Sequence, residues 1–325
     1  MIAGQIVCPR HLEIVEVPIP KIADGEVLVR LDVGSICGSD LPFFQLDTSH
    51  PHPALFGVSA PLPPRMSLHE LVGFVAQSRN TGFREGDRVL GLPTVPHSGL
   101  AEYFVSSNDR AVILPDGPAN RLVLSQPLGT VVHACLKLPD VIGQTVVVLG
   151  QGPIGLLFDA LLRHLGAERV IAVDLLPDRL NVSRTMGATH VVSAKTENVT
   201  AVVKAITDGK LADVVVEAIG KAETLNLGAG LLRRNGTLLG FGLPHQFNYE
   251  FPFHEFFWNE GRLICSLGPT LDDFHTAVEM ISNGVIDVTP LLTHNFPLSA
   301  AQEAFTLFAD RADGVIKVAL TSAAN

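Results

Sequence analysis

A glycine-rich turn between a short apolar run and an amphipathic segment constrains this chain more than any other feature. Residues 145–149 (TVVVL) are continuously apolar, as in a strand buried on both faces of a parallel sheet. Residues 150–155 read Gly-Gln-Gly-Pro-Ile-Gly, and apolar side chains then recur at helical spacing as far as Leu165. A strand, a glycine turn and a helix in this order predict the start of a doubly wound α/β sheet.

The same turn predicts a dinucleotide site. Gly150, Gly152 and Gly155 permit a tight turn, a close approach of the backbone to a pyrophosphate, and close packing of helix on strand. Ile154 lies in the first turn of the helix, whose free N–H groups would face the phosphates. Asp174 ends the next expected strand, where a carboxylate accepts ribose hydroxyls and repels a 2′-phosphate. The residues therefore predict NAD rather than NADP.

The alternation of strands and helices continues beyond this turn. Further strands are expected at 169–173, 190–193, 213–218 and 236–241, and further helices at 178–186, 199–206 and 224–232. This pattern predicts a parallel sheet over the zone from about 121 to 267. Arg179 lies five residues after Asp174. It has two open interpretations, a contact to the adenine end or a phosphate of the cofactor, or a helix-surface arginine without a role.

The segments on either side of this zone have a different sequence pattern. Residues 1 to about 120 hold short apolar runs between Gly, Pro and Asp residues, which is typical of β-strands. The clearest of these runs lie at 14–20, 26–36 and 70–78, and the proline-rich stretch 50–64 predicts a loop. The last zone predicts helices at 271–282 and 300–308 and a closing strand at 315–320.

Charge, cysteine content and hydropathy exclude several classes of function. The chain has 23 Lys and Arg against 33 Asp and Glu residues, and this net charge of −10 argues against nucleic-acid or membrane partners. Its four cysteines, Cys8, Cys37, Cys135 and Cys265, are too scattered for a disulfide framework or a cysteine-rich structural zinc site. The start lacks the pattern of a secretory signal, and charged residues interrupt the longest apolar stretch. We therefore expect a cytoplasmic protein.

A second constellation lies in the N-terminal zone. Cys37 follows an expected strand, Asp40 comes three residues later, and His69 and Glu70 precede the next strand. A thiolate, an imidazole and a carboxylate form a plausible three-ligand zinc set with an open fourth position, and Asp40 is a candidate partner of a ligand. The residue types alone also fit a buried cysteine and a core histidine, so both interpretations stay open.

These motifs, in this order, resemble the medium-chain dehydrogenase/reductase family, in its zinc-dependent alcohol and polyol (sorbitol-dehydrogenase-like) branch. The resemblance spans ICGSD (36–40), HELVG (69–73), GDRV (86–89), GLAEY (99–103), QPL (126–128) with His133-Ala134, the glycine turn, Asp174 and Val318. It implies a GroES-like, β-rich catalytic domain made of residues 1–122 and 268–325. A Rossmann NAD-binding domain, residues 123–267, would be inserted in it.

The resemblance also implies an activity. A catalytic zinc would bind Cys37, His69 and Glu70, and Ser39 would relay the substrate proton. The reaction would transfer a hydride between a secondary alcohol, of polyol or sugar type, and NAD. The partner would be a small alcohol or ketone, and the protein a dimer or tetramer paired through the Rossmann domain. Because the cysteine-rich lobe is missing, we expect one zinc and no structural zinc.

The chain departs from the family pattern at several positions. Leu68 stands where a glycine is usual before His-Glu, and Gln126 where a carboxylate or thiolate is usual. The relay histidine after the cysteine motif is missing, which leaves His50 or His52 as a replacement or as plain loop residues. The expected specificity pocket includes Phe43, Phe44, Leu92 and residues 267–270. The alternatives are a zinc-free NAD(P)H-dependent quinone or alkene reductase and a non-catalytic NAD-binding sensor.

Overall fold

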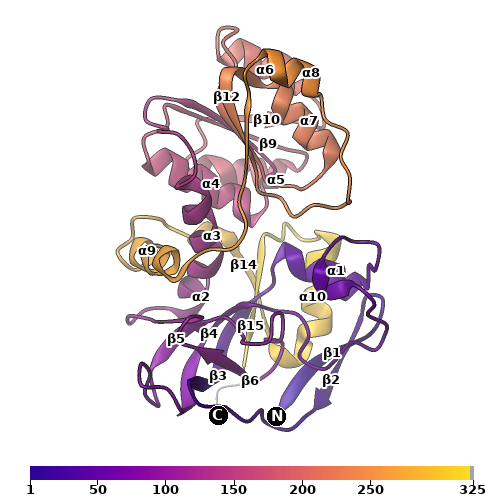
Figure 1. The fold of residues 1–325 in the computed structure, drawn as a ribbon, viewed down its shortest axis with the longest axis vertical. Coiled ribbons are helices and arrows are strands. Elements are labelled where there is room, and N and C mark those ends of the chain that lie inside the picture. Colours follow the sequence, from indigo (N-terminus) through magenta and orange to yellow (C-terminus); the bar gives the residue numbers. More distant parts are fainter. Residues whose placement is uncertain (323–325) are drawn as a thin grey trace. The chain divides into compact units, whose positions relative to one another are not determined.

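The computed structural model describes residues 1–322 and divides into two compact units (Figure 1). One unit combines Met1–Gly129 with Thr270–Asn325, and the other is Thr130–Pro269. The indigo start and the yellow end of the sequence therefore belong to one unit in Figure 1. The expected domain boundaries at 122 and 267 lie a few residues before these. No helix among residues 1–322 combines the length and apolar character needed to cross a bilayer.

The middle unit is a doubly wound sheet whose strands are all parallel, in the order β10-β9-β8-β11-β12-β13. Its strands are β8 (Thr145–Leu149), β9 (Arg169–Asp174), β10 (His190–Ser193), β11 (Ala212–Glu217), β12 (Leu232–Gly240) and β13 (Arg262–Cys265). Its helices are α4 (Pro153–His164), α5 (Pro177–Thr185), α6 (Val199–Ile206), α7 (Ala222–Gly230) and α8 (Phe253–Trp258). The order confirms the predicted Rossmann topology: the chain adds β9 and β10 on one side of β8 and then crosses to add β11, β12 and β13 on the other, so the strand order reverses between β8 and β11.

Local sequence explains why this unit forms. Every residue of β8 is buried, because the strand lies between β9 and β11 in the middle of the sheet. Pro153 occupies the first turn of α4 with Gly152 as its N-cap, and the apolar stripe of the helix is buried. The glycine turn therefore lies at the carboxyl end of the central strand, beside the reversal point where such sheets bind ligands.

The other unit is built on a mostly antiparallel sheet in the order β14-β15-β3-β4-β5-β7, with β6 also paired to β3. Its strands are β3 (Glu26–Ser35), β4 (Glu70–Ser78), β5 (Arg88–Gly91), β6 (Tyr103–Ser107), β7 (Ala111–Ile113), β14 (Leu292–Pro297) and β15 (Lys317–Thr321), and β1 (Ile2–Cys8) pairs with β2 (His11–Glu16). Its helices are α1 (Leu41–Gln45), α2 (Ala119–Leu122), α9 (Leu271–Ser282) and α10 (Ala301–Asp310), and α3 (Ser125–Cys135) crosses the boundary in the chain.

Strand β3 organises this unit and the site within it. It pairs with β4 on one side, where Ser35 lies opposite Glu70, and with β15, where Ser35 lies opposite Ala319. A core of buried apolar residues packs around it, including Val29, Leu31 and Phe305. Two distant parts of the chain thereby meet at the end of β3, directly before Cys37.

Some elements differ from the sequence prediction. The strand expected at 14–20 is β2, His11–Glu16, and it ends before the prolines at 18 and 20, which cannot donate to a ladder. The short strands β1, β13 and β14 and helix α8 were not predicted, because four to seven residues carry little periodic signal. The loop expected at 50–64 contains one short 3-10 turn, Pro53–Leu55.

Candidate active site

Cys37 lies in a turn that two strands hold in place. Directly after β3, the Ile36 N–H donates to the Val318 carbonyl on β15 (3.0 Å). The Cys37 N–H then donates to the Asp40 carboxylate (2.8 Å), and the chain enters a 3-10 turn at Gly38–Asp40. The Cys37 side chain is partly exposed, and its sulfur faces the start of β4.

His69 is placed by two residues with left-handed backbone. Ser67 has φ +106° and Leu68 has φ +68°, a region that favours glycine. This conformation favours the glycine that the resemblance leads us to expect at the position of Leu68. The Leu68 side chain is fully buried and packs so closely on Gly34 that a Cβ there would lie 2.6 Å from it. Packing therefore holds the leucine in an unfavourable conformation directly before the histidine.

The structure brings Cys37, His69 and Glu70 together. One potential ligand atom from each of the three lies within 4.8 Å of the others. Tetrahedral zinc has bonds of about 2.0–2.3 Å to such atoms, so its ligands stand about 3.3–3.8 Å apart, and a small contraction closes this set around the ion. The donor types and their spacing therefore fit a zinc ion with an open position.

Asp40 stabilises this set of residues through hydrogen bonds to the chain on both sides of it. The carboxylate is fully buried and accepts hydrogen bonds from the N–H groups of Cys37 and Leu68 and from the Ser67 hydroxyl. Its Oδ1 lies 3.6 Å from Nδ1 of His69. Burial alone would raise the pKa of Asp40, but the contacts with His69 and the Cys37 N–H outweigh it and lower the pKa to about 2. A carboxylate that orients a histidine ligand in this way is common behind zinc.

The groups around His69 also change the pKa of its imidazole. Burial alone would lower the pKa of the His69 imidazole, but its hydrogen bonds and charge interactions with Asp40 and Cys37 raise the pKa well above its usual range. The same surroundings therefore favour a positive charge at the centre of the site. A divalent cation satisfies that preference with His69 in its neutral form.

Glu70 has a partner that sequence reasoning missed. The Lys317 ammonium, on β15, donates to both Glu70 carboxylate oxygens (2.6 and 2.5 Å) and to the Ile36 carbonyl (2.9 Å). The Ser35 hydroxyl donates to the same carboxylate, and Glu70 and Lys317 are both buried. These bonds leave one lone pair of the carboxylate for a metal. The signal in the sequence was a single lysine inside the apolar run VIKVAL.

The other predicted residues lie in less defined surroundings. Ser39 is the middle residue of the turn Gly38–Asp40, partly exposed, and its hydroxyl takes no part in the hydrogen bonds that hold that turn. Gln126 is buried in α3. His50 is buried in the loop after α1, and its N–H donates to the Asp47 carbonyl.

His97, which sequence reasoning missed, lies beside His52, which it named as a possible replacement for the relay histidine. His97 lies in the loop after β5, and its ring contacts that of His69, with centroids 5.1 Å apart. The His52 ring contacts His97 in turn (4.9 Å). Burial, together with the positive charge of His69, lowers the pKa of His97 to about 4 and also lowers the pKa of His52. No spacing rule links His97 to His69, so no local pattern pointed to it.

The Rossmann unit contains the predicted cofactor turn. Gly150 has φ +94°, and a Cβ there would lie 2.5 Å from Ile219, which follows β11. A Cβ on Gly155 would lie 1.8 Å from the Gly150 carbonyl oxygen, so only glycine fits that position. Gly152 caps α4, and Ile154 is its second residue. The turn has the open, side-chain-free backbone that a pyrophosphate needs.

Asp174 and Arg179 both reach this turn. One oxygen of the Asp174 carboxylate accepts from the Gln151 N–H (2.6 Å) and the other from the Leu176 N–H (2.8 Å). A nitrogen of the Arg179 guanidinium lies 3.7 Å from where a Cβ of Gly152 would stand. Of the two interpretations of Arg179, this position favours a contact with a phosphate or the adenine end.

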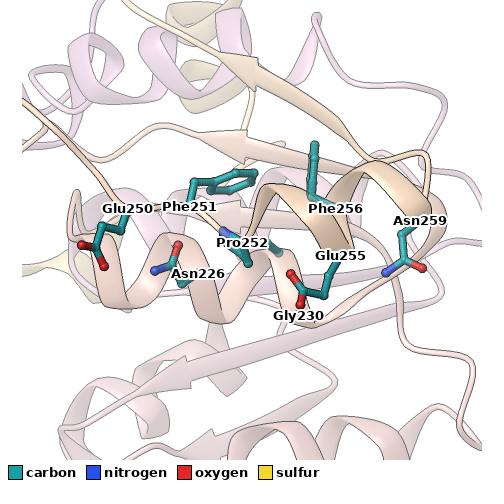
Figure 2. A pocket seen from close by; sticks show the side chains of 9 residues that line it. Asn226, Gly230, Glu250, Phe251, Pro252, Glu255, Phe256 and Asn259 are labelled. Atoms are coloured by element: carbon teal, nitrogen blue, oxygen red, sulfur yellow. The ribbon is translucent and has the colours of Figure 1, made fainter.

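A separate pocket of about 420 Å³ lies between α7 and the segment that leads through α8 (Figure 2). Figure 2 shows Asn226 and Gly230 on one wall and Glu255, Phe256 and Asn259 on the other. Glu250, Phe251, Pro252 and Ala229 complete its lining. None of the predicted metal or cofactor residues lines this pocket, so the pocket is separate from the candidate active site.

Comparison with known proteins agrees with the geometry. Residues 23–116 match the alcohol dehydrogenase GroES-like domain, and residues 153–283 match the zinc-binding dehydrogenase domain. An alcohol dehydrogenase of Cupriavidus necator is 28% identical, with 98% of each chain aligned. A sorbitol dehydrogenase of Bacillus subtilis is 27% identical over 91% of this chain and 90% of its own. The fold of an alcohol dehydrogenase from Thermus sp. ATN1 superposes with a TM-score of 0.87, at 23% identity over 99% and 100% of the two chains.

The chain therefore belongs to the medium-chain dehydrogenase/reductase family, with the domain pair of its zinc-binding alcohol and polyol dehydrogenases. It is an oxidoreductase of the alcohol dehydrogenase type, and Cys37, His69 and Glu70 are a group that could hold the zinc ion. The resemblance inferred from the motifs, and the Rossmann plus GroES-like fold that it implied, are confirmed.

Proposed function

We propose that this protein oxidises a secondary alcohol of polyol type with NAD, and reduces the corresponding ketone in reverse. The observation that carries the proposal is the convergence of Cys37, His69 and Glu70 within 4.8 Å, with Asp40 held behind His69. The 27% identity to a sorbitol dehydrogenase supports a polyol substrate, and the similar identity (28%) to an alcohol dehydrogenase is the reason to test simple alcohols beside it. When bound, zinc would supply Lewis-acid polarisation of the substrate oxygen, and NAD would supply a hydride acceptor.

The residues of the chain divide the remaining work. Cys37, His69 and Glu70 would hold the metal and leave one position open for the substrate oxygen. Asp40 fixes the ring of His69, and Lys317 fixes the carboxylate of Glu70. We propose that Ser39, two residues from Cys37, accepts the proton of the alcohol and passes it outward. A relay through His50 or His52 stays a prediction.

The Rossmann unit would bind the cofactor. We propose that Gly150, Gly152 and Gly155 accommodate the pyrophosphate and that the α4 N-terminus, including Ile154, faces it. Asp174 would accept the adenosine ribose hydroxyls, because each oxygen of its carboxylate keeps a lone pair beyond the backbone bond that it accepts. Arg179 beside Gly152 would add a positive charge near the phosphates.

Assembly and location are further proposals. Strand β13 ends the order of the Rossmann sheet within residues 1–322, and apolar side chains around it are exposed, among them Trp258 (67%) and Leu267 (87%). Exposed apolar patches of this kind mark association surfaces. We propose a homo-oligomer, dimer or tetramer, that pairs through this unit in the cytoplasm. Light scattering during gel filtration measures the state, and a monomer at micromolar concentration would contradict the proposal.

The test of the proposed function is a NAD-reduction assay over polyols and simple secondary alcohols. The protein is purified without chelator, and its zinc content is measured. We expect turnover with at least one polyol, and loss of zinc and turnover together in Cys37→Ser, with the exposed Cys8→Ser as the matched control. Turnover of quinones or activated alkenes by zinc-free protein would instead support the reductase. NAD binding without any turnover would support the sensor.

A further inference from the structure

Three imidazoles and one phenyl ring pack side by side next to the proposed metal ligands. The His97 ring contacts His69 at 5.1 Å between centroids and His52 at 4.9 Å. Phe43, which is fully buried, contacts both His97 (4.9 Å) and His52 (5.0 Å). A ring nitrogen of His97 also lies within 4.8 Å of potential ligand atoms of His69 and Asp40. The cluster thus forms a wall directly beside the metal ligands.

The backbone holds His97 in this place. Its carbonyl accepts the Ser67 N–H (2.7 Å), and the N–H of Gly99 reaches the carbonyls of Ser67 and Leu68 (3.1 Å each). The loop residues after β5 therefore pair with the segment that leads into His69. His97 itself adopts φ +54°, a conformation that a non-glycine residue keeps only where its surroundings hold it.

His97 also carries an unsatisfied polar atom. Its Nδ1 is buried and has no hydrogen-bond partner among residues 1–322. A buried donor or acceptor without a partner is unfavourable, so the site gains when a polar group binds there. Nδ1 of His52 is already an acceptor for the Ala54 N–H (3.2 Å), which leaves Nε2 of His52 as its donor. The wall therefore offers hydrogen bonds next to the metal ligands, with Phe43 as its apolar backing.

Two roles fit a histidine so close to a metal ligand. As a ligand, His97 would share an ion with Asp40 and His69, but that ion would take His69 away from the group with Cys37, whose thiolate is a donor that zinc prefers. As a wall residue, it would meet the part of the substrate next to the reacting carbon. The thiolate available only in the Cys37 group favours the second role.

We propose that His97, with His52 beside it, recognises a second hydroxyl group on the carbon adjacent to the one oxidised, and so selects vicinal diols and polyols over simple secondary alcohols. This inference rests on the proposed function and names the feature of the substrate that the site reads. A site built to hydrogen-bond a hydroxyl discriminates strongly against an analogue that lacks it, because its own polar atoms then stay unpaired.

The experiment compares two substrates that differ by that one hydroxyl, 2,3-butanediol and 2-butanol. The ratio of their kcat/KM values is measured for the unchanged enzyme, His97→Phe, His97→Asn and the exposed control His11→Phe. We expect the ratio to favour the diol in the unchanged enzyme and to fall about tenfold or more in His97→Phe. It should fall less in His97→Asn, which keeps hydrogen bonding and tolerates a positive φ, and stay unchanged in His11→Phe.

Two further readouts do not depend on turnover. Zinc per chain should be the same in His97→Asn and the unchanged protein, and a loss would make His97 a ligand and overturn the proposal. The second readout is NMR of unchanged, zinc-loaded protein with ¹⁵N-labelled histidine. The chemical shifts of the His97 ring nitrogens should change when 2,3-butanediol is added and stay constant when 2-butanol is added. The His97→Asn spectrum identifies those signals, so this measurement stands even where His97→Phe fails to fold.

The outcomes separate this inference from the proposed function. Absence of turnover with every alcohol in zinc-loaded, NAD-binding protein overturns the proposed function. Normal turnover with an equal preference for diol and monoalcohol, or with a preference that His97→Phe leaves intact, overturns only the role of His97. Equal changes in the His97 chemical shifts with both alcohols would likewise overturn only the role of His97.

Discussion

At the scale of single residues, a lysine and a leucine show how the fold constrains the site. The buried pair of Lys317 and Glu70 places a positive charge against a proposed zinc ligand. Leu68 keeps a left-handed backbone directly before His69. Both residues stabilise the geometry of neighbouring residues that are proposed to bind zinc. A substitution at each of them separates its structural contribution from the function of its neighbour.

Lys317→Met should destabilise the zinc-free protein by about 3–5 kcal/mol, because it leaves the Glu70 carboxylate buried without a partner. If Glu70 is a zinc ligand, the metal compensates that charge, so the loss should be clearly smaller in zinc-loaded protein. Urea unfolding with and without chelator measures both values, and the exposed Lys21→Met is the control. An equal loss in the two states would remove Glu70 from the ligand set.

Leu68→Gly should be less destabilising than Leu68→Ala, the reverse of the usual order. Both variants lose a fully buried side chain, which costs about 2–5 kcal/mol. Glycine recovers about 1–2 kcal/mol because it adopts φ +68° without strain, whereas alanine keeps the strain. Thermal unfolding of the two variants gives the order. A more stable alanine variant would show that the leucine backbone is not strained.

Asp174 should set the choice of cofactor. Its carboxylate repels a 2′-phosphate and accepts ribose hydroxyls, so NAD should bind at least about tenfold tighter than NADP. Asp174→Ala should shrink that preference, because the repulsion and the hydrogen bonds are both lost. Fluorescence titration with both cofactors measures the two affinities. Equal affinities in the unchanged protein would show that Asp174 does not select.

At the scale of elements, helix α4 holds a buried carboxyl under the glycine turn. Asp159 is fully buried on α4, near the side chains of Gln151 and Ser183. Burial raises the pKa of Asp159 well above its usual range, and the two polar neighbours lower it only in part. The folded protein therefore holds a proton there at pH values where the unfolded chain has lost it.

This proton makes stability depend on pH. Because the folded state binds the proton more tightly, stability falls as the pH rises from the unfolded pKa, about 3.9, towards the raised folded value. Asp159→Asn should remove that decline, so its stability relative to the unchanged protein should increase with pH across this window. Urea midpoints at several pH values measure it, with the exposed Asp208→Asn as control. Parallel pH profiles for Asp159→Asn and the unchanged protein would contradict the assignment.

At the scale of the whole molecule, the groups of potential metal ligands set the zinc content. The two groups found among residues 1–322, Cys37-His69-Glu70 and Asp40-His69-His97, share His69, so they hold one ion between them. Cys8, Cys135 and Cys265 belong to neither group. Elemental analysis should find about one zinc per chain. Two zinc ions per chain would contradict the expected loss of the structural site.

Much of the fold was predictable because its signals are local. The strand, glycine turn and helix at 145–165 lie within one short stretch, and burial on both faces shows directly as a continuous apolar run. The expected helices at 199–206 and 271–282 match α6 and α9, since each carries a helical apolar period and a capping residue, Asn198 or Thr270. The short strands β13 and β14 have no such pattern and were missed.

The residues that hold the proposed metal ligands in place, and those proposed to recognise the substrate, depend instead on contacts between distant parts of the chain. The resemblance to a known family pointed to Cys37, His69 and Glu70, and a glycine turn followed by an acidic residue pointed to the cofactor, because the motifs that carry these signals lie within or beside single elements. Lys317 meets Glu70 across 247 residues through the pairing of β15 and β4 with β3. His97 meets His69 only because its loop pairs with Ser67. A local pattern specifies an element, but sheet register decides which distant side chains share one buried site.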